Sequence, residues 1–286
     1  MRLARLAGIE VDSKLRDCFS SLDVSAPADY RELASLLAQE WLKSSPSRVG
    51  ISGGQGAGKT TLGGLIEAAC SERGIRACII SLDDFYLPKA SRRERAEAIH
   101  PLFETRGPPG THDMALCAAT LSALEEARDV SIPVFDKTAD DRSGSRIVRG
   151  PFDVTVLEGW CVGARAIDGG LLDDSPNTLE IERDPDGSWR RAVNQTLLND
   201  YEPIWNTLDS LIYLRVPSID AVARWRAQQE EAYTVDRRMT RSEIDTFVEY
   251  FERITRRMLV EQTALADWVV GLDEEHRVED LLIRTR

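Results

Sequence analysis

The sequence of 286 residues lacks the cysteine patterns that form disulfide frameworks and zinc sites. Its five cysteines are an odd number, are scattered along the chain and include no C-x-x-C pair, as is typical of a reducing compartment. No apolar run approaches the roughly 18 residues that a membrane-spanning helix needs. Residues 1–10 have no apolar core of signal-peptide length. The sequence therefore predicts a cytoplasmic protein that has no membrane partner.

The chain also has no excess of positive charge. It contains 36 Lys and Arg residues and 48 Asp and Glu residues, which gives a net charge of −12. General nucleic-acid-binding proteins carry a basic face, so no nucleic-acid partner is expected. Half of the net charge comes from residues 167–202, which hold nine acidic and three basic side chains. The segments 89–106, 136–149 and 215–241 are mildly basic. Small anionic ligands therefore remain compatible with the acidic composition.

Short apolar runs alternate with helical patterns along the chain. The expected strands are 49–52, 77–82, 153–157, 210–216 and 268–272. The expected helices are 27–43, 59–73, 113–127, 188–208, 219–233 and 241–266. This alternation predicts an α/β fold whose mostly parallel sheet is covered by helices on both faces. Ligands of such sheets bind beyond the carboxyl ends of the strands.

A glycine-rich segment between the first strand and its helix has the phosphate-loop pattern G-x-x-x-x-G-K-[ST]. Its glycines let successive backbone N–H groups converge on phosphate oxygens, at the positive end of the helix. Lys59 is expected to reach the β- and γ-phosphates, and the Thr60 hydroxyl to coordinate Mg²⁺. A plain glycine-rich turn is the alternative. The predicted ATP-binding residues are Gly53, Gly54, Gln55, Gly56, Ala57, Gly58, Lys59, Thr60 and Thr61.

Two carboxylates follow the second and third expected strands. Phosphoryl transfer to a hydroxyl needs a base near that hydroxyl and an acid near the metal. Asp83 is placed to accept the proton, and Glu158 is placed to hold the metal or its waters. The predicted catalytic residues are Lys59, Asp83 and Glu158, and the predicted metal site consists of Thr60, Asp83 and Glu158. The alternatives are an Asx turn or helix cap at Asp83 and a solvated strand end at Glu158.

With these motifs the sequence resembles the superfamily of uridine kinase, phosphoribulokinase and pantothenate kinase, and within it the D-glycerate 3-kinase family. The resemblance runs from about Val49 to the C-terminus. It rests on GISGGQGAGKTTL, SLDDFYL, RGPPGTHD, IPVFDKTADDR, VLEGWCVG, NQTLLNDY and RWRAQQEEA. Two positions differ from the usual family pattern: Gly54 stands in place of proline, and Ala57 in place of cysteine. Both are variable positions of the loop, so phosphate binding should not be affected.

The resemblance implies a three-layer fold of the P-loop NTPase type. It also implies transfer of the γ-phosphate of Mg-ATP to a hydroxyl of D-glycerate, giving 3-phosphoglycerate, with the matching aspartate as base and the matching glutamate supporting Mg²⁺. Other acceptors remain open: a nucleoside, pantothenate or a different hydroxy acid. A nucleotide-binding switch without kinase activity is the alternative from another class. The N-K-x-D motif of a guanine-binding switch is absent, however, and Lys59, Asp83 and Glu158 are all present.

The two loops that carry the more specific motifs are expected to bind the acceptor. A glycerate carboxylate needs a cation, preferably a guanidinium, which Arg106, Lys137 or Arg142 would supply. His112, Asp113 and Asp136 are expected to bind hydroxyls, and Tyr86 to pack against the acceptor. The alternative is structural, since G-P-P-G forms a rigid turn and Asp113 is a good helix N-cap.

The sequence predicts two parts, a helical N-terminal extension, 1–47, and a kinase domain, 48–286. Within the domain, residues 84–149 carry the acceptor-binding loops, 167–202 form an acidic, insertion-like segment, and 217–241 form a lid. Arg224 and Arg226 of the lid are expected to stabilise charge on the transferring phosphoryl group. A solvated helix face, with Glu230 as the partner of Arg226, is the alternative. The oligomeric state is not predicted.

Overall fold

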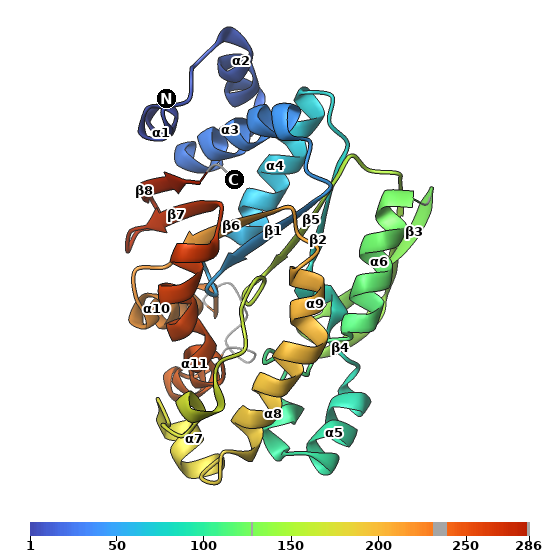
Figure 1. Ribbon diagram of the computed structural model, residues 1–286, viewed down its shortest axis with the longest axis vertical. Coiled ribbons are helices and arrows are strands. Elements are labelled where there is room, and N and C mark those ends of the chain that lie inside the picture. The colour runs from blue at the N-terminus through green and yellow to red at the C-terminus, as the bar shows by residue number, and fades with distance from the viewer. Residues whose placement is uncertain (127, 231–238, 285–286) are drawn as a thin grey trace.

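The computed structural model describes residues 1–126, 128–230 and 239–284, and a six-stranded sheet forms its centre (Figure 1). The strands lie in the order β2-β5-β1-β6-β7-β8. Their bounds are β1 Arg48–Gly53, β2 Ala77–Ser81, β5 Val154–Gly159, β6 Ser210–Arg215, β7 Trp268–Leu272 and β8 Val278–Ile283. β8 runs antiparallel to β7, and the other neighbours are parallel. The predicted α/β fold with a mostly parallel sheet is confirmed.

Both faces of the sheet are buried, as the apolar strand sequences require. Ile212 and Leu214 of β6 face one hydrophobic core, whereas Leu211 and Tyr213 face the other, because successive side chains of a strand point to opposite faces. The first core is built with helices α1 Arg2–Ala7, α2 Ser13–Ser21, α3 Ala28–Ser44, α4 Lys59–Glu72 and α10 Ile219–Glu230. The second is built with α6 Met114–Glu126, α8 Ser188–Thr196, α9 Glu202–Trp205 and α11 Arg241–Leu265.

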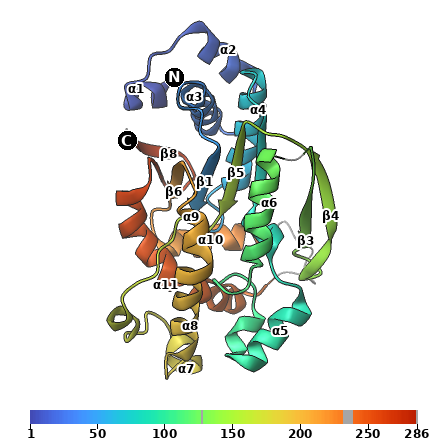
Figure 2. The ribbon, with the colours of Figure 1, turned by 45° about the vertical axis from the view of Figure 1, so that its right-hand side comes forward.

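Between β2 and β5 the chain leaves the sheet and forms a separate β-hairpin. β3 Asp129–Asp136 pairs with β4 Asp141–Arg149 in antiparallel register. Figures 1 and 2 show the hairpin outside the main sheet, next to α6. The connection from β2 to α6 holds η1 Leu82–Phe85, α5 Lys89–Ala98 and η2 Pro101–Glu104. Most of this connection and the whole hairpin belong to the expected acceptor-binding region, 84–149. Both parts reach the carboxyl ends of the strands.

The acidic segment 167–202 is folded around buried ion pairs. It contains η3 Gly169–Leu172, α7 Thr178–Arg183, α8 and η4 Leu197–Tyr201. The side chains of Glu180 and Asp184 are fully buried, and Arg190 pairs with both, at 3.8 and 3.1 Å. Arg253 of α11 donates from Nε to Oε1 of Glu180 at 2.8 Å. The buried charges of Glu180 and Asp184 are therefore paired with arginines, and Glu180 ties this segment to α11.

The N-terminal helices join both the phosphate-loop helix and the last strand. α3 packs along α4, and Asp29 Oδ2 accepts hydrogen bonds from the Arg2 guanidinium and from the Val278 backbone N–H, each at 3.1 Å. All five cysteines are buried free thiols. Within the described residues, no helix combines the length and the apolar character needed to cross a membrane.

Candidate active site

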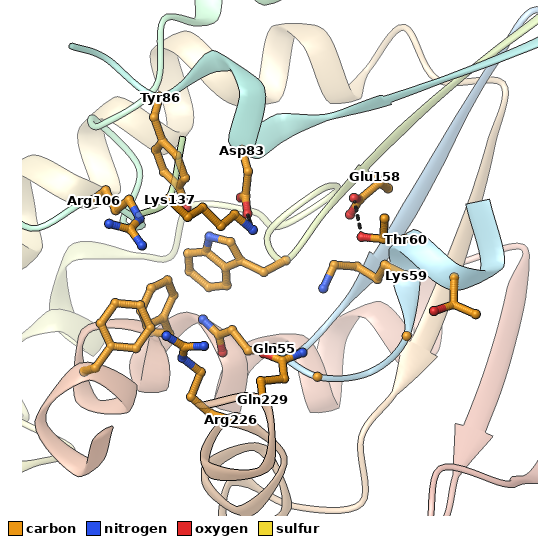
Figure 3. Close-up of a pocket in the computed structure, with 16 residues that line it drawn as sticks. Gln55, Lys59, Thr60, Asp83, Tyr86, Arg106, Lys137, Glu158, Arg226 and Gln229 are labelled. Atoms are coloured by element: carbon orange, nitrogen blue, oxygen red, sulfur yellow. Dashed lines mark hydrogen bonds and ion pairs between the residues drawn. The ribbon is translucent and has the colours of Figure 1, made fainter. Parts of the chain in front are cut away.

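A cavity of about 310 Å³ opens at the carboxyl ends of β1, β2 and β5 (Figure 3). It lies where a parallel sheet places its ligands. The phosphate loop and α10 form one side of it, and the loops after β2 and β5 form the other. Its walls consist of Gln55, Gly56, Gly58, Lys59, Thr60, Thr61, Asp83, Tyr86, Arg106, Lys137, Glu158, Trp160, Arg226, Gln229, Phe247 and Phe251.

The phosphate loop has the backbone conformation that its glycines were expected to allow. Gly56 and Gly58 both have φ of +80°, and a Cβ atom at Gly56 would lie 2.6 Å from Cβ of Trp225. Lys59 Nζ donates to the carbonyl oxygens of Gly53 and Gly54 at 2.8 and 3.0 Å. Burial lowers the pKa of Lys59, against the opposing effect of the nearby carboxylates of Glu158 and Asp83. The ammonium group is thus held in the cavity beside the loop.

Tyr30 of α3 supports this loop from behind, a role that the sequence did not indicate. Its hydroxyl donates to the carbonyl oxygen of Ala57 at 2.7 Å. Its ring packs on Gly58, where an added Cβ would lie 2.9 Å from Cε1. Burial raises the pKa of Tyr30, so the hydroxyl remains a donor. The N-terminal helices therefore hold the phosphate loop directly.

The Tyr30→Phe variant tests this support. We expect its KM for ATP to rise roughly threefold to tenfold, because the Ala57 carbonyl loses a buried hydrogen bond. The value of kcat should change little. Steady-state kinetics with varied ATP measure the effect, and Tyr213→Phe is the control because Tyr213 is buried in β6 and does not line the cavity. Equal KM values in wild type and Tyr30→Phe would contradict the proposed support.

Thr60 and Glu158 form an oxygen pair suited to a hard cation. The Thr60 hydroxyl lies 2.9 Å from Oε1 of Glu158, which is 4% exposed at the end of β5. Mg²⁺ prefers oxygen ligands and commonly takes one or two from the protein, with the rest from phosphates and water. Among the described residues, no group of three or more His, Cys, Asp or Glu side chains could hold a metal alone. The donors present therefore fit Mg²⁺ bound together with a nucleotide.

Asp83 lies at the end of β2, opposite the phosphate loop, and pairs with Lys137. The Lys137 ammonium is 2.6 Å from Oδ2 of Asp83, and the Asp83 backbone N–H donates to the Ser81 hydroxyl at 3.3 Å. Burial alone would raise the pKa of Asp83, but the charge and hydrogen bond of Lys137 outweigh it and lower the pKa. The carboxylate is therefore ionised and able to accept a proton.

Two arginines also line the cavity. Arg106 pairs with Asp140, which also pairs with the buried Arg92 at 2.7 Å. Arg226 projects from α10, with its guanidinium 5.3 Å from the ring centroid of Phe247. Figure 3 shows Arg106 and Arg226 on opposite sides of the cavity. Both arginines line the cavity that the phosphate loop and Asp83 also line.

Aromatic rings form a wall that sequence reasoning missed. Trp160 donates from Nε1 to the Gly107 carbonyl at 3.1 Å and meets Phe251 edge to face, with ring centroids 4.9 Å apart. Phe247 lies beside Phe251 at 4.8 Å. Trp160 follows Glu158 by two residues, and this proximity was an available signal. The two phenylalanines have helical spacing, which resembles an ordinary core pattern.

Several predicted acceptor residues lie behind the cavity wall. His112 stacks under Tyr86, with ring centroids 4.3 Å apart, and its Nδ1 is 2.7 Å from the Tyr201 hydroxyl. Burial lowers the pKa of His112 to about 3, so the ring is neutral. Arg142 donates to the Tyr86 carbonyl at 2.9 Å and pairs with Asp113 at 3.2 Å. These residues fix the loop that presents Tyr86 rather than lining the cavity.

The remaining predicted residues outside the wall have local partners. Asp113 also accepts from the Leu116 backbone N–H at 3.1 Å and so caps α6. Asp136 accepts from the Thr138 backbone N–H at 2.8 Å in a turn. Arg224 points away from the cavity and pairs with Glu274. In the loop itself, Gly53, Gly54 and Ala57 do not line the cavity, because they pack against the strand ends and α10.

Part of the expected lid lies outside the described residues. Within 217–241 the structure describes residues 217–230 and 239–241, whereas residues 231–238 and the side chain of Glu230 are not described. α10 contributes Arg226 and Gln229 to the cavity. The α10 helix is thus next to the phosphate loop, and its role as a lid stays a prediction.

No model of a known protein family matches the chain, but individual proteins do. The uncharacterised kinase mug58 of Schizosaccharomyces pombe is 33% identical over 222 residues, covering 72% of this chain and 78% of that protein. The chloroplastic D-glycerate 3-kinase of Arabidopsis thaliana is 29% identical over 218 residues, 71% of this chain. The alignment spans 45% of that plant protein.

A solved structure shares the fold over nearly the whole chain. The YGR205w protein superposes with a TM-score of 0.71 at 25% identity, covering 89% of this chain and 96% of that one. Sequence and structure agree that the chain belongs to the family of P-loop kinases that includes D-glycerate 3-kinase and is related to uridine kinase.

Proposed function

We propose that this kinase transfers the γ-phosphate of Mg-ATP to a hydroxyl of D-glycerate, giving 3-phosphoglycerate. One observation carries the proposal: Asp83 and Arg106 line the same small cavity as the phosphate loop. A hydroxy acid needs a base for its hydroxyl and a guanidinium for its carboxylate, and these two residues would provide them. A relative with this activity, the plant enzyme, supports the same acceptor.

The phosphates of ATP would be held by Lys59 and by the backbone N–H groups of the loop. Thr60 and Glu158 would hold Mg²⁺, which supplies positive charge to the transferring phosphoryl group. Asp83 would orient the acceptor hydroxyl and take its proton as the new P–O bond forms. Lys137 would keep the Asp83 carboxylate ionised until that point. Catalysis would then consist of positioning and electrostatic stabilisation.

Arg226 would act at the same centre from α10. It enters the cavity from the side of the phosphate loop, where a guanidinium can stabilise charge on the transferring phosphoryl group. We assign this role to Arg226 and not to Arg224, since Arg224 pairs with Glu274 outside the cavity. We further propose that the enzyme works in the cytoplasm, which is consistent with its buried free thiols.

An ADP-release assay over a panel of acceptors tests the proposed reaction. The panel holds D-glycerate, L-glycerate, uridine, pantothenate and ribulose 5-phosphate, and NMR identifies the phosphorylated product. We expect the largest kcat/KM for D-glycerate and 3-phosphoglycerate as its product. Absence of turnover with D-glycerate would overturn the acceptor assignment. Turnover of another compound would leave the kinase activity in place and identify its acceptor.

The Arg106→Gln variant tests the carboxylate site. We expect its KM for D-glycerate to rise on the order of tenfold to a hundredfold, because a charge-assisted hydrogen bond is lost. Its KM for ATP should not change. The fold should tolerate the variant, since Asp140 keeps its ion pair with Arg92. Arg93→Gln, at an exposed arginine paired with Glu104, is the matched control, and an unchanged KM for D-glycerate in Arg106→Gln would exclude this contact.

A further inference from the structure

The side chain of Gln55 is a polar group of the cavity to which the proposed reaction gives no role. Nε2 and Oε1 of its amide are both buried, and neither has a hydrogen-bond partner among the residues that the structure describes. A buried amide without partners costs free energy, so native proteins rarely keep one without a reason. The residue lines the cavity. A ligand that satisfies both atoms would remove this cost.

The backbone on either side of Gln55 fixes where its side chain points. A Cβ atom at Gly54 would lie 2.9 Å from Cγ2 of Val222, and one at Gly56 would lie 2.6 Å from Cβ of Trp225. The loop is therefore pressed against α10 at both neighbours. Figure 3 shows the Gln55 side chain in the cavity, on the side of α10 and across from Arg106 and Lys137. It thus faces the space assigned to the acceptor.

The two orphaned atoms make different demands on a ligand. Oε1 requires a donor, which a phosphoryl group cannot supply because its oxygens only accept. Nε2 requires an acceptor, which a carboxylate or a hydroxyl supplies. One small group that meets both demands is a hydroxyl adjacent to a carboxylate. The pair of atoms therefore fits a 2-hydroxy acid better than it fits the phosphates of the nucleotide.

We propose that the Gln55 amide binds the 2-hydroxyl and the carboxylate of the acceptor, and so selects 2-hydroxy acids over acids that lack this hydroxyl. This assignment rests on the proposed function and adds a specificity-determining residue to it. Asp83 takes the proton of the hydroxyl that is phosphorylated, whereas Gln55 forms a hydrogen bond with the neighbouring 2-hydroxyl. Arg106 supplies the charge that holds the carboxylate.

A cycle of two enzymes and two substrates tests the proposal. D-Glycerate and 3-hydroxypropionate share the 3-hydroxyl and the carboxylate, and differ in the 2-hydroxyl. We expect wild type to prefer D-glycerate in kcat/KM by on the order of tenfold to a hundredfold, since the analogue leaves Oε1 unpaired. In Gln55→Leu this preference should fall to a few-fold, because the leucine makes no hydrogen bond to either compound.

Two further measurements separate this role from others. The melting temperature of ligand-free Gln55→Leu should equal or exceed that of wild type, because an unpaired buried amide is replaced by an apolar group of similar size. Gln55 is among the predicted ATP-binding residues, but the substitution keeps the backbone N–H groups through which the loop would hold the phosphates, so its KM for ATP should not change. The matched control is Gln39→Leu, at a buried glutamine of α3 outside the cavity, which should leave the substrate preference intact.

The outcomes are distinct. Loss of the preference in Gln55→Leu with unchanged KM for ATP supports the assignment. An undiminished preference overturns it, and so does a higher KM for ATP alone, which would place the amide at the nucleotide. In both cases the proposed reaction stands, because wild type turns over D-glycerate. A wild-type enzyme inactive on both compounds would overturn the proposed function and this assignment with it.

Discussion

Replacing Lys59 by alanine is expected to reduce ADP formation on the order of 10³-fold to 10⁵-fold at saturating ATP. The Lys59 ammonium is buried in the cavity, next to the carbonyl oxygens of Gly53 and Gly54. In that position its positive charge can stabilise the negative charge that moves from the γ-phosphate towards ADP. No other lysine of the cavity wall replaces it within the described residues, because Lys137 is engaged by Asp83.

A coupled ADP assay measures this loss. Lys43→Ala is the matched control, since Lys43 is an exposed side chain of α3 that pairs with Glu40. Circular dichroism melting separates a loss of catalysis from a loss of folding, and we expect both variants to melt cooperatively. Turnover in Lys59→Ala close to that of wild type would remove the phosphate loop from the reaction.

The Asp83→Asn variant is expected to lose on the order of 10²–10⁴ in kcat, the usual contribution of a general base. Asparagine keeps the size of the side chain but cannot take the hydroxyl proton. The KM for Mg-ATP should remain near that of wild type, because the phosphate loop lies on the other side of the cavity. The loss should therefore be confined to the chemical step.

Single-turnover kinetics with preformed enzyme–ATP complex measure that step directly. The neighbouring Asp84 offers a matched control: burial raises its pKa, and it does not line the cavity. We expect Asp84→Asn to change kcat by no more than a few-fold. An Asp83→Asn enzyme as fast as wild type would show that Asp83 is a turn residue and not the base.

The parallel strands could be predicted because they are buried on both faces. β6 and β7 are short, almost uninterrupted apolar runs, and the observed bounds lie within one residue of those expected from the sequence. α11 was equally clear, since its apolar positions recur with helical spacing over 25 residues. In each case one strong local pattern agrees with the tertiary position of the element.

The hairpin and the acidic segment were harder to predict, for different reasons. β4 is largely exposed and rich in arginine and serine, so it lacks an apolar pattern. The single helix expected over 188–208 is instead three consecutive segments: α8, a π-helical segment, Leu197–Tyr201, and α9. Glu180 and Asp184 belong to the acidic segment and were not predicted from the sequence to be buried. Their burial depends on arginines distant in sequence, which no local pattern reveals.

The residues of the candidate site also differ in how well the sequence predicted their positions. Lys59, Asp83 and Glu158 lie at or shortly after the carboxyl ends of strands, so the sheet brings them to one edge, and all three line the cavity. The acceptor residues sit in long connections, where spacing says little about direction. His112 and Arg142 accordingly belong to the layer behind Tyr86. Phe251 was missed because its pattern is that of a core helix.

The hydrogen bonds that Asp29 accepts from Arg2 and Val278 also determine when, during synthesis, the phosphate loop gains its full support. Asp29 precedes Tyr30, so the helix that supports the phosphate loop is secured by a strand almost 250 residues further along the chain. A growing polypeptide contains its whole nucleotide-binding motif long before that strand leaves the ribosome. The support of the loop is therefore completed only after β8 has been synthesised, well after the loop itself.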